Sequence, residues 1–141
     1  MLNSSRVLGL HHVAFAEGQG ASLVETFQRV LGLHVVTVER ASGFTERMID
    51  VGNCSLQGLE ATSDGVVKRS LDRRGPGLHH IALEVDDIAA TMTELREHGI
   101  GFVDPEPRTG GGGHLVAFAH PKSFGGVLVE FVEVHAHPSQ S

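Results

Sequence analysis

The chain has 141 residues, a formal net charge of −6 and ten histidines, and it contains neither tyrosine nor tryptophan. A hydrophobic fraction of 40% and a charged fraction of 20% are typical of a folded globular domain and exclude a disordered chain. Because a protein that neutralises many phosphates is normally basic, this charge argues against nucleic acid as a partner. Without tyrosine, no phenol is available as an acid or a base.

The first half of the chain is expected to fold as strand, helix and three strands. A histidine-containing strand at 9–15 is followed by apolar residues at helical spacing, which end at Gly32. β-Branched runs and turn residues then predict three strands. The predicted elements are a helix at 21–31 and strands at 33–38, 44–51 and 54–60. A linker at 61–76 follows, with a short helix possible at 66–73.

The second half repeats the first. Residues 77–83 read GLHHIAL and residues 9–15 read GLHHVAF, so the histidine pair recurs 68 residues later. The same order of elements is predicted after it: a helix at 86–98, capped by Asp86 or Asp87 and ended by Gly99, then three strands. These strands are expected at 100–103, 114–120 and 127–134.

The repeat predicts an α+β fold in which two βαβββ modules pair into one cupped, open-barrel mixed sheet with the helices outside. A module of this size buries too little core to fold alone. The chain is therefore expected to be a single domain, residues 1–141. Its parts are module one at about 8–60, the linker at 61–76, module two at about 77–134 and a polar tail at 135–141.

Equivalent positions in the two modules carry the candidate ligands for a metal. His12 and His80 occupy the same place in the first strands, and Gln57 and Glu130 align in the last strands. Glu130 lies among apolar neighbours, where a charge needs a partner. One divalent metal would satisfy all four side chains, and two imidazoles with two oxygens suit Co²⁺, Mn²⁺, Ni²⁺ or Zn²⁺.

A histidine pair in a strand is more often hydrogen-bonded structure than a metal site, and only its recurrence favours the ligand interpretation. Strand alternation sends the two histidines of a pair to opposite faces. We assign the second of each pair to the metal. His11 and His79 are then expected to support the site from the helix-facing side.

The glycine run at 110–113 lacks the Lys-Ser/Thr ending of a phosphate loop, so a flexible hairpin over the mouth of the site is expected. Basic residues at 68–74 are interpreted as solvated surface. Arg108, Lys122 and Ser123 are predicted to bind the substrate. With Cys54 alone there is no intrachain disulfide, which favours the cytoplasm, and the opening residues contain no apolar run that suggests a membrane segment.

Four stretches resemble the vicinal oxygen chelate superfamily of glyoxalases, bleomycin-resistance proteins and extradiol dioxygenases, and most of all its methylmalonyl-CoA epimerases. They are FQRVLGL (27–33), DVGNCSLQGLE (50–60), GLHHIALEVDDI (77–88) and DPEPRTGGGGHLVAFAHPKSFGGVLVEFVE (104–133). The resemblance covers 10–133. It implies paired βαβββ modules, one divalent metal held by His12, Gln57, His80 and Glu130, an acyl-CoA-like substrate and a homodimer.

The activity that the resemblance implies is an isomerase of the epimerase type, which moves the α-proton of a CoA thioester through a metal-stabilised enolate. Glu130 is the expected base on one face. The family's second acid or base is a glutamate at the position of Ala41 here, so Glu39 or Glu46 is a candidate substitute. Two alternatives stay open. One is a glyoxalase-type isomerase or lyase, or another vicinal oxygen chelate enzyme, acting on a different carbonyl substrate. The other is a non-catalytic small-molecule binding or resistance protein.

Overall fold

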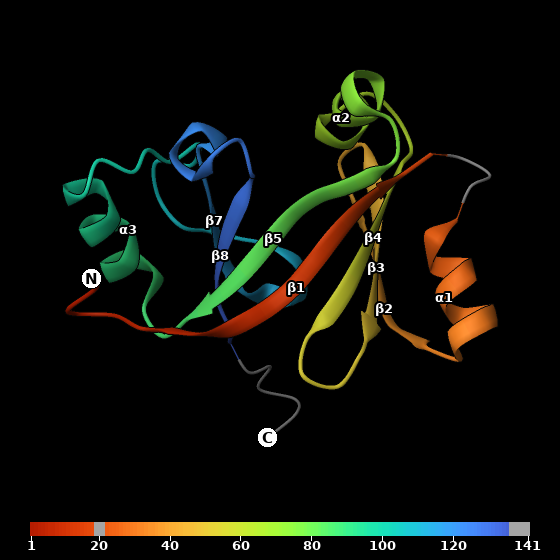
Figure 1. The fold of residues 1–141 in the computed structure, drawn as a ribbon, viewed down its shortest axis with the longest axis horizontal. Helices are drawn as coiled ribbons and strands as arrows, with labels where there is room; N and C mark the ends of the chain where they lie inside the picture. Colours follow the sequence, from red (N-terminus) through yellow and green to blue (C-terminus); the bar gives the residue numbers. More distant parts are fainter. Residues whose placement is uncertain (19–21, 136–141) are drawn as a thin grey trace. The chain divides into compact units, whose positions relative to one another are not determined.

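A computed structural model describes residues 1–18 and 22–135 of the chain. The predicted helix start at Ala21 and most of the predicted tail, residues 136–141, lie outside these ranges. Within them the chain forms eight strands and three α-helices, which confirms the predicted α+β fold (Figure 1). The strands are hydrogen-bonded in the order β2-β3-β4-β1-β5-β8-β7-β6, with both parallel and antiparallel pairs.

The elements follow the predicted order. They are β1 (Val7–Glu17), α1 (Leu23–Leu31), β2 (His34–Ala41), β3 (Phe44–Asp50), β4 (Ser55–Ala61), α2 (Val66–Arg74), β5 (Gly77–Val85), α3 (Ile88–Glu97), β6 (Arg108–Thr109), β7 (Leu115–Ala119) and β8 (Val129–Glu133), with 3₁₀ turns η1 (Gly111–Gly113) and η2 (Pro121–Phe124). The helix predicted within the linker is α2.

Two compact units divide the chain. The central unit is His12–His79, and the terminal unit combines Met1–His11 with the chain from His80 onward. The boundaries fall inside β1 and β5, between the two histidines of each repeated pair. Each of these strands therefore contributes residues to both units.

In the central unit, β1 and β4 run parallel and β3 pairs antiparallel with both β2 and β4. Helix α1 begins where the Ser22 hydroxyl accepts a hydrogen bond from the Glu25 N–H, and it ends at Gly32 in the left-handed conformation. Buried Glu17, at the end of β1, accepts from the Val24 N–H at 2.9 Å. The core is formed by Ala14, Ala16, Leu59 and Val67.

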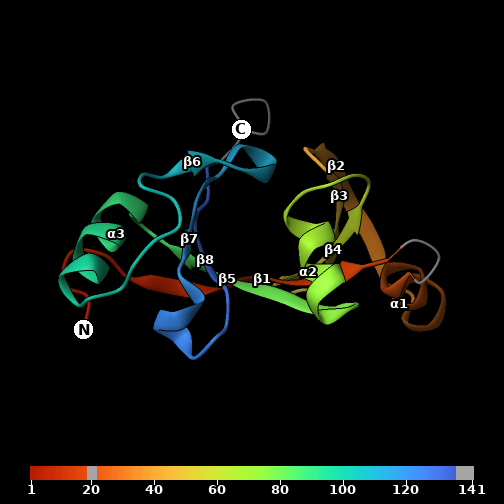
Figure 2. The same ribbon diagram turned by 90° about the horizontal axis from the view of Figure 1, so that it is seen from above.

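In the terminal unit, β5 and β8 run parallel, β7 pairs antiparallel with β8, and α3 contacts β7 and β8 (Figure 2). Asp87 caps α3 by accepting from the Ala90 N–H. The carboxylate of Glu94 on α3 accepts from the N–H groups of Asn3 and Ser4 and from the Ser4 hydroxyl. A core of Val85, Ile88, Met92, Ala117, Ala119, Val129 and Phe131 lies between the helix and the strands.

The prediction of a strand at 100–103 is wrong. These residues make only an isolated bridge, Phe102 with Ala119, and the strand that pairs with β7 is the two-residue β6. Pro105 and Pro107 have no N–H for a ladder. The Asp104 carboxylate accepts from the Phe118 N–H at 2.8 Å, in place of a backbone carbonyl. The glycine run forms η1 at the tip of the β6–β7 hairpin.

Candidate metal centre

In the central unit, strand register places His12 and Gln57 on one face of the β1–β4 pair. His12 pairs with Ser55 and Ala14 pairs with Gln57, so the side chains of all four residues point to the same side. Both ligand candidates are buried, with 5% and 6% of their surface exposed. A buried imidazole beside a buried amide needs polar partners, which a cation or hydrogen bonds can supply.

The Gln57 amide has one such partner on β3. Its Nε2 donates to Glu46 Oε2 at 3.1 Å. Gln57 is directly opposite Met48, and Glu46 lies two residues before Met48, so Glu46 is a diagonal neighbour on the same face. Glu39 of β2 is directly opposite Glu46, so a second carboxylate also faces this side.

In the terminal unit, the same register recurs between β5 and β8. Ala82 pairs with Glu130, so His80, two residues earlier, shares a face with the carboxylate. His80 Nε2 lies 3.5 Å from Glu130 Oε1, and both residues are buried. The His80 ring also forms a T-shaped contact with the Phe118 ring of β7, with ring centroids 5.1 Å apart.

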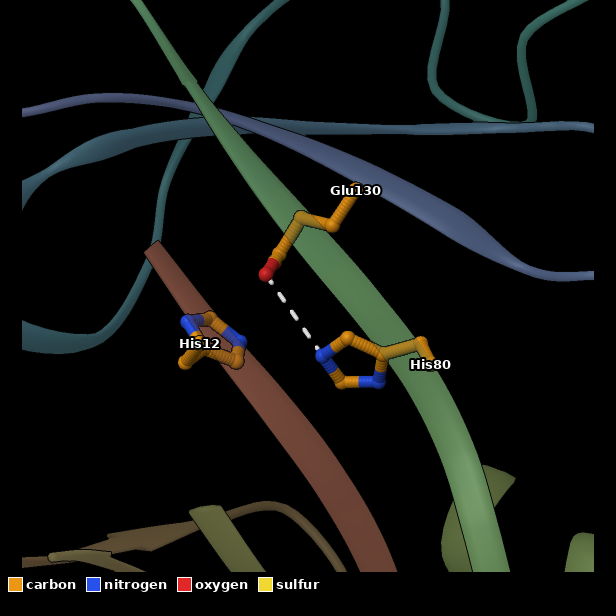
Figure 3. Close-up of side chains that lie close together, drawn as sticks. All are labelled: His12, His80 and Glu130. Carbon is orange, nitrogen blue, oxygen red and sulfur yellow. Dashed lines mark ion pairs between the residues drawn. The ribbon is translucent and has the colours of Figure 1, made fainter. Parts of the chain in front are cut away.

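His12, His80 and Glu130 form the group that could hold a metal ion among the residues that the structure describes. Each offers one ligand atom, and these atoms all lie within 4.8 Å of one another. Figure 3 shows the His80 ring directed at the Glu130 carboxylate, with His12 beside them. Two imidazoles and one carboxylate, all buried, are a donor set that fits a first-row divalent ion.

The predicted substrate residues lie in the terminal unit at different places. Arg108 on β6 forms an ion pair with Asp104 at 3.1 Å, and its guanidinium lies over the Phe118 ring, 5.7 Å from the centroid. Lys122 and Ser123 are both in η2, where Lys122 is exposed and Ser123 Oγ accepts from the Gly101 N–H at 3.4 Å. Arg108 and His80 therefore both contact the Phe118 ring.

Sequence reasoning missed two neighbours of the candidate ligands. The sequence suggests Glu46 only as a possible acid or base, whereas in the structure it accepts a hydrogen bond from the Gln57 amide. Phe118, which contacts His80, had not been considered at all. Strand alternation from the ligand positions could have found both, because Phe118 pairs directly with Glu130 and Glu46 lies diagonally from Gln57.

Residues 9–118 match the family model described as the glyoxalase/bleomycin resistance protein/dioxygenase superfamily. The chain therefore belongs to this superfamily, as its motifs had indicated.

Its relatives show which members of this superfamily the chain is similar to. The chain is 33% identical over 128 residues to the mitochondrial methylmalonyl-CoA epimerase of Dictyostelium discoideum, covering 88% of this chain and 77% of the relative. It is 33% identical over 130 residues to the ethylmalonyl-CoA/methylmalonyl-CoA epimerase of Cereibacter sphaeroides, covering 89% and 97%. These relatives confirm the predicted resemblance to the methylmalonyl-CoA epimerases.

Solved structures agree. The crystal structure of methylmalonyl-CoA epimerase from Mycobacterium tuberculosis superposes with a TM-score of 0.89 at 32% identity, covering 100% of this chain and 97% of the other. A methylmalonyl-CoA epimerase in complex with methylmalonyl-CoA and NH4⁺ gives a TM-score of 0.86 at 32% identity, covering 93% and 97%. Of the helices in the described ranges, none combines the length and apolar character needed to span a membrane.

Proposed function

We propose that the chain is a divalent-metal-dependent epimerase that moves the α-proton of a CoA thioester such as methylmalonyl-CoA. The observation that carries the proposal is the buried group of His12, His80 and Glu130, in a chain whose relatives are named methylmalonyl-CoA epimerases. Residues 1–141 would act as one domain of two modules. A homodimer and a cytoplasmic location are also part of the proposal.

The metal would be held by His12, Gln57, His80 and Glu130, and Co²⁺, Mn²⁺, Ni²⁺ and Zn²⁺ all suit these donors. When bound, a divalent ion supplies Lewis-acid stabilisation of the negative charge that develops on the thioester oxygen. Gln57 supports this set because register places it on the face of His12 within the central unit.

Glu130 is the proposed base. Its carboxylate is buried and its Oε1 lies 3.5 Å from His80 Nε2, which supports a role in accepting the α-proton of a thioester bound at this group. Returning a proton to the opposite face of the planar intermediate needs a second group. Ala41 is opposite Phe44 at the β2–β3 turn and cannot provide it, so Glu39 and Glu46 are the proposed candidates.

Arg108, Lys122 and Ser123 are the proposed substrate contacts. An acyl-CoA carries several negative charges, and a guanidinium and an ammonium are the side-chain groups that favour them. The position of Arg108 over Phe118, which itself contacts His80, supports a role for Arg108 in particular.

Proton exchange tests the proposal directly. The full chain, loaded with each of the four metals in turn, is incubated with methylmalonyl-CoA in D₂O, and α-deuteration and epimer conversion are followed. We expect both with at least one metal. Binding of the thioester without exchange would instead support the non-catalytic alternative, and exchange without epimer conversion would indicate one-sided proton transfer. Full epimerisation by both Glu39→Ala and Glu46→Ala would exclude these residues as the second acid or base.

A further inference from the structure

The Gln57 amide has two chemically different ends. Its oxygen can bind a cation, whereas its nitrogen carries two hydrogens and can only donate. A rotation of the amide exchanges the two ends with almost no change in shape, so something else must select the orientation that presents oxygen. A carboxylate ligand such as Glu130 needs no such selection, because its two oxygens are equivalent.

Glu46 meets this need in the central unit. An ionised carboxylate only accepts hydrogen bonds, and the Gln57 Nε2 donates to Glu46 Oε2 at 3.1 Å. The contact directs the NH₂ end of the amide toward β3 and leaves Oε1 at the other end. Both side chains are shielded from water, since Gln57 is buried and Glu46 half-buried, which strengthens a charge-assisted bond.

The two modules of the repeat allow the neighbours of Gln57 and Glu130 to be compared at equivalent positions. Met48 is opposite Gln57 on β3, and Phe118 is opposite Glu130 on β7. Counting two residues back from each gives Glu46 in the central unit and Val116 in the terminal unit. The position next to the amide is therefore an acceptor, and the position next to the carboxylate is a buried apolar residue. Of these two equivalent positions, the one that carries an acceptor lies beside the candidate ligand that has two unlike ends.

We infer that Glu46 is a positioning residue, which fixes the Gln57 amide with its oxygen available to the metal. The inference rests on the proposed function, because it takes Gln57 as a ligand. Residues that orient metal ligands typically alter metal affinity by about 10–100-fold when they are removed. The effect should depend on a hydrogen-bond acceptor at position 46 and should operate only through Gln57.

The test measures Co²⁺ binding to the metal-free full chain by calorimetry and by visible absorption. Glu46→Met keeps the length of the side chain but removes the acceptor, and we expect binding about 10–100-fold weaker. Glu46→Gln removes the charge but keeps an acceptor oxygen, and we expect it to restore most of the affinity. Glu60→Met is the matched control, because Glu60 is half-buried on the opposite face of β4 and pairs with Arg47 at 3.1 Å. It should bind Co²⁺ like the unaltered chain.

A double-mutant cycle separates the outcomes. If Glu46 acts through Gln57, Glu46→Met should weaken binding no further in a Gln57→Ala background. A Gln57→Ala variant that binds normally would remove Gln57 from the ligand set, and with it this inference. If Gln57→Ala weakens binding but Glu46→Met does not, the metal site stands and the positioning role is overturned. Equal losses in Glu46→Met and Glu60→Met would overturn it as well.

A second measurement covers the case in which Glu46→Met does not fold. The side-chain NH₂ signals of ¹⁵N-labelled Gln57 report its hydrogen bond directly, and Glu46→Gln and Glu46→Ala can both be compared with the unaltered chain. We expect the signals to move in both variants, and furthest in Glu46→Ala. Signals that stay in place in Glu46→Ala would show that Glu46 does not hold the amide.

Discussion

The two modules place their candidate ligands by the same backbone rule and then surround them differently. In each, a histidine on the first strand is followed two residues later by an alanine, Ala14 or Ala82, which pairs with the second ligand on a parallel strand. The second ligand is an amide, Gln57, in the central unit and a carboxylate, Glu130, in the terminal unit. Backbone register thus preserves position, while the side chain decides whether the ligand carries charge and can accept a proton.

The residue after each of these ligands shows a second difference. It is Gly58 in the central unit and Phe131 in the terminal unit. Phe131 is buried in a core with Phe102 and Phe124, at centroid distances of 6.0 and 6.4 Å. A Cβ on Gly58 would overlap the Val24 side chain of α1. Helix α1 therefore packs closely against its strand because Gly58 has no side chain. The interior of the terminal unit is instead filled by aromatic side chains.

The largest expected effect comes from making the two ligands alike. Glu130→Gln gives both modules an amide, which removes the proposed base and one negative ligand. We expect epimerisation to fall by about 10²–10⁴-fold, the usual contribution of a general base, as measured by epimer conversion of methylmalonyl-CoA. Glu133→Gln is the control, because its side chain points to the opposite face and its Oε1 accepts from the Ile88 N–H. An active Glu130→Gln variant would contradict the base assignment.

A smaller effect is expected from the close approach at Gly58. Gly58→Ala forces Val24 or Glu17 to move, since the Glu17 carboxylate is 3.1 Å from the added carbon. Overpacking of this kind lowers the free energy of unfolding by about 1–3 kcal/mol, which urea denaturation can measure. Gly9→Ala should have little effect, because nothing lies within 4 Å of its added Cβ. Equal stability of the two variants would show that α1 can shift away from the sheet at little cost.

The smallest expected effect concerns the contact between helix α3 and the first residues of the chain, which has no counterpart among the described residues at the exposed end of α1. Helix α3 binds the first residues of the chain through Glu94, whereas α1 ends in the exposed Val30 and Leu31. Hydrogen bonds from the Ser4 hydroxyl and the Asn3 N–H hold the pKa of Glu94 below its ordinary 4.5. Because the folded-state pKa is lowered, this attachment is complete above pH 4.5 and is lost as the pH falls through the lowered pKa.

Amide NMR of Asn3 and Ser4 checks this pH dependence. We expect their signals to move in the acid range in the unaltered chain and to lose that transition in Glu94→Gln. A transition that persists in Glu94→Gln would belong to another carboxylate. We expect Glu94→Gln to affect only the first residues of the chain. Its free energy of unfolding near neutral pH should therefore equal that of the unaltered chain.

Much of this arrangement could be predicted because the sequence repeats. The recurrence of the GLHH segment predicted His12 and His80 as ligands, and the alignment of the last strands added Gln57 and Glu130. Of these four, the structure brings His12, His80 and Glu130 together. The strand predicted at 100–103 did not form because its β-branched residues lie between Gly99 and Pro105. The residue after it, Asp104, accepts the Phe118 N–H through its side chain and not through its backbone carbonyl. The contact between Glu46 and Gln57 was not predicted, although β3 and β4 are consecutive strands, because it depends on the pairing register of their hairpin.

The unit boundaries inside β1 and β5 also bear on how the protein is made. Residues 1–11 belong to the same unit as the chain from His80 onward, and Arg6 and Asp86 bond across that separation at 2.8 Å. During translation the N-terminal residues leave the ribosome long before their partners exist, and they must wait until α3 has emerged. Residues 1–11 can therefore become ordered only after the segment around Asp86 has been made, and such contacts between distant parts of the chain slow folding.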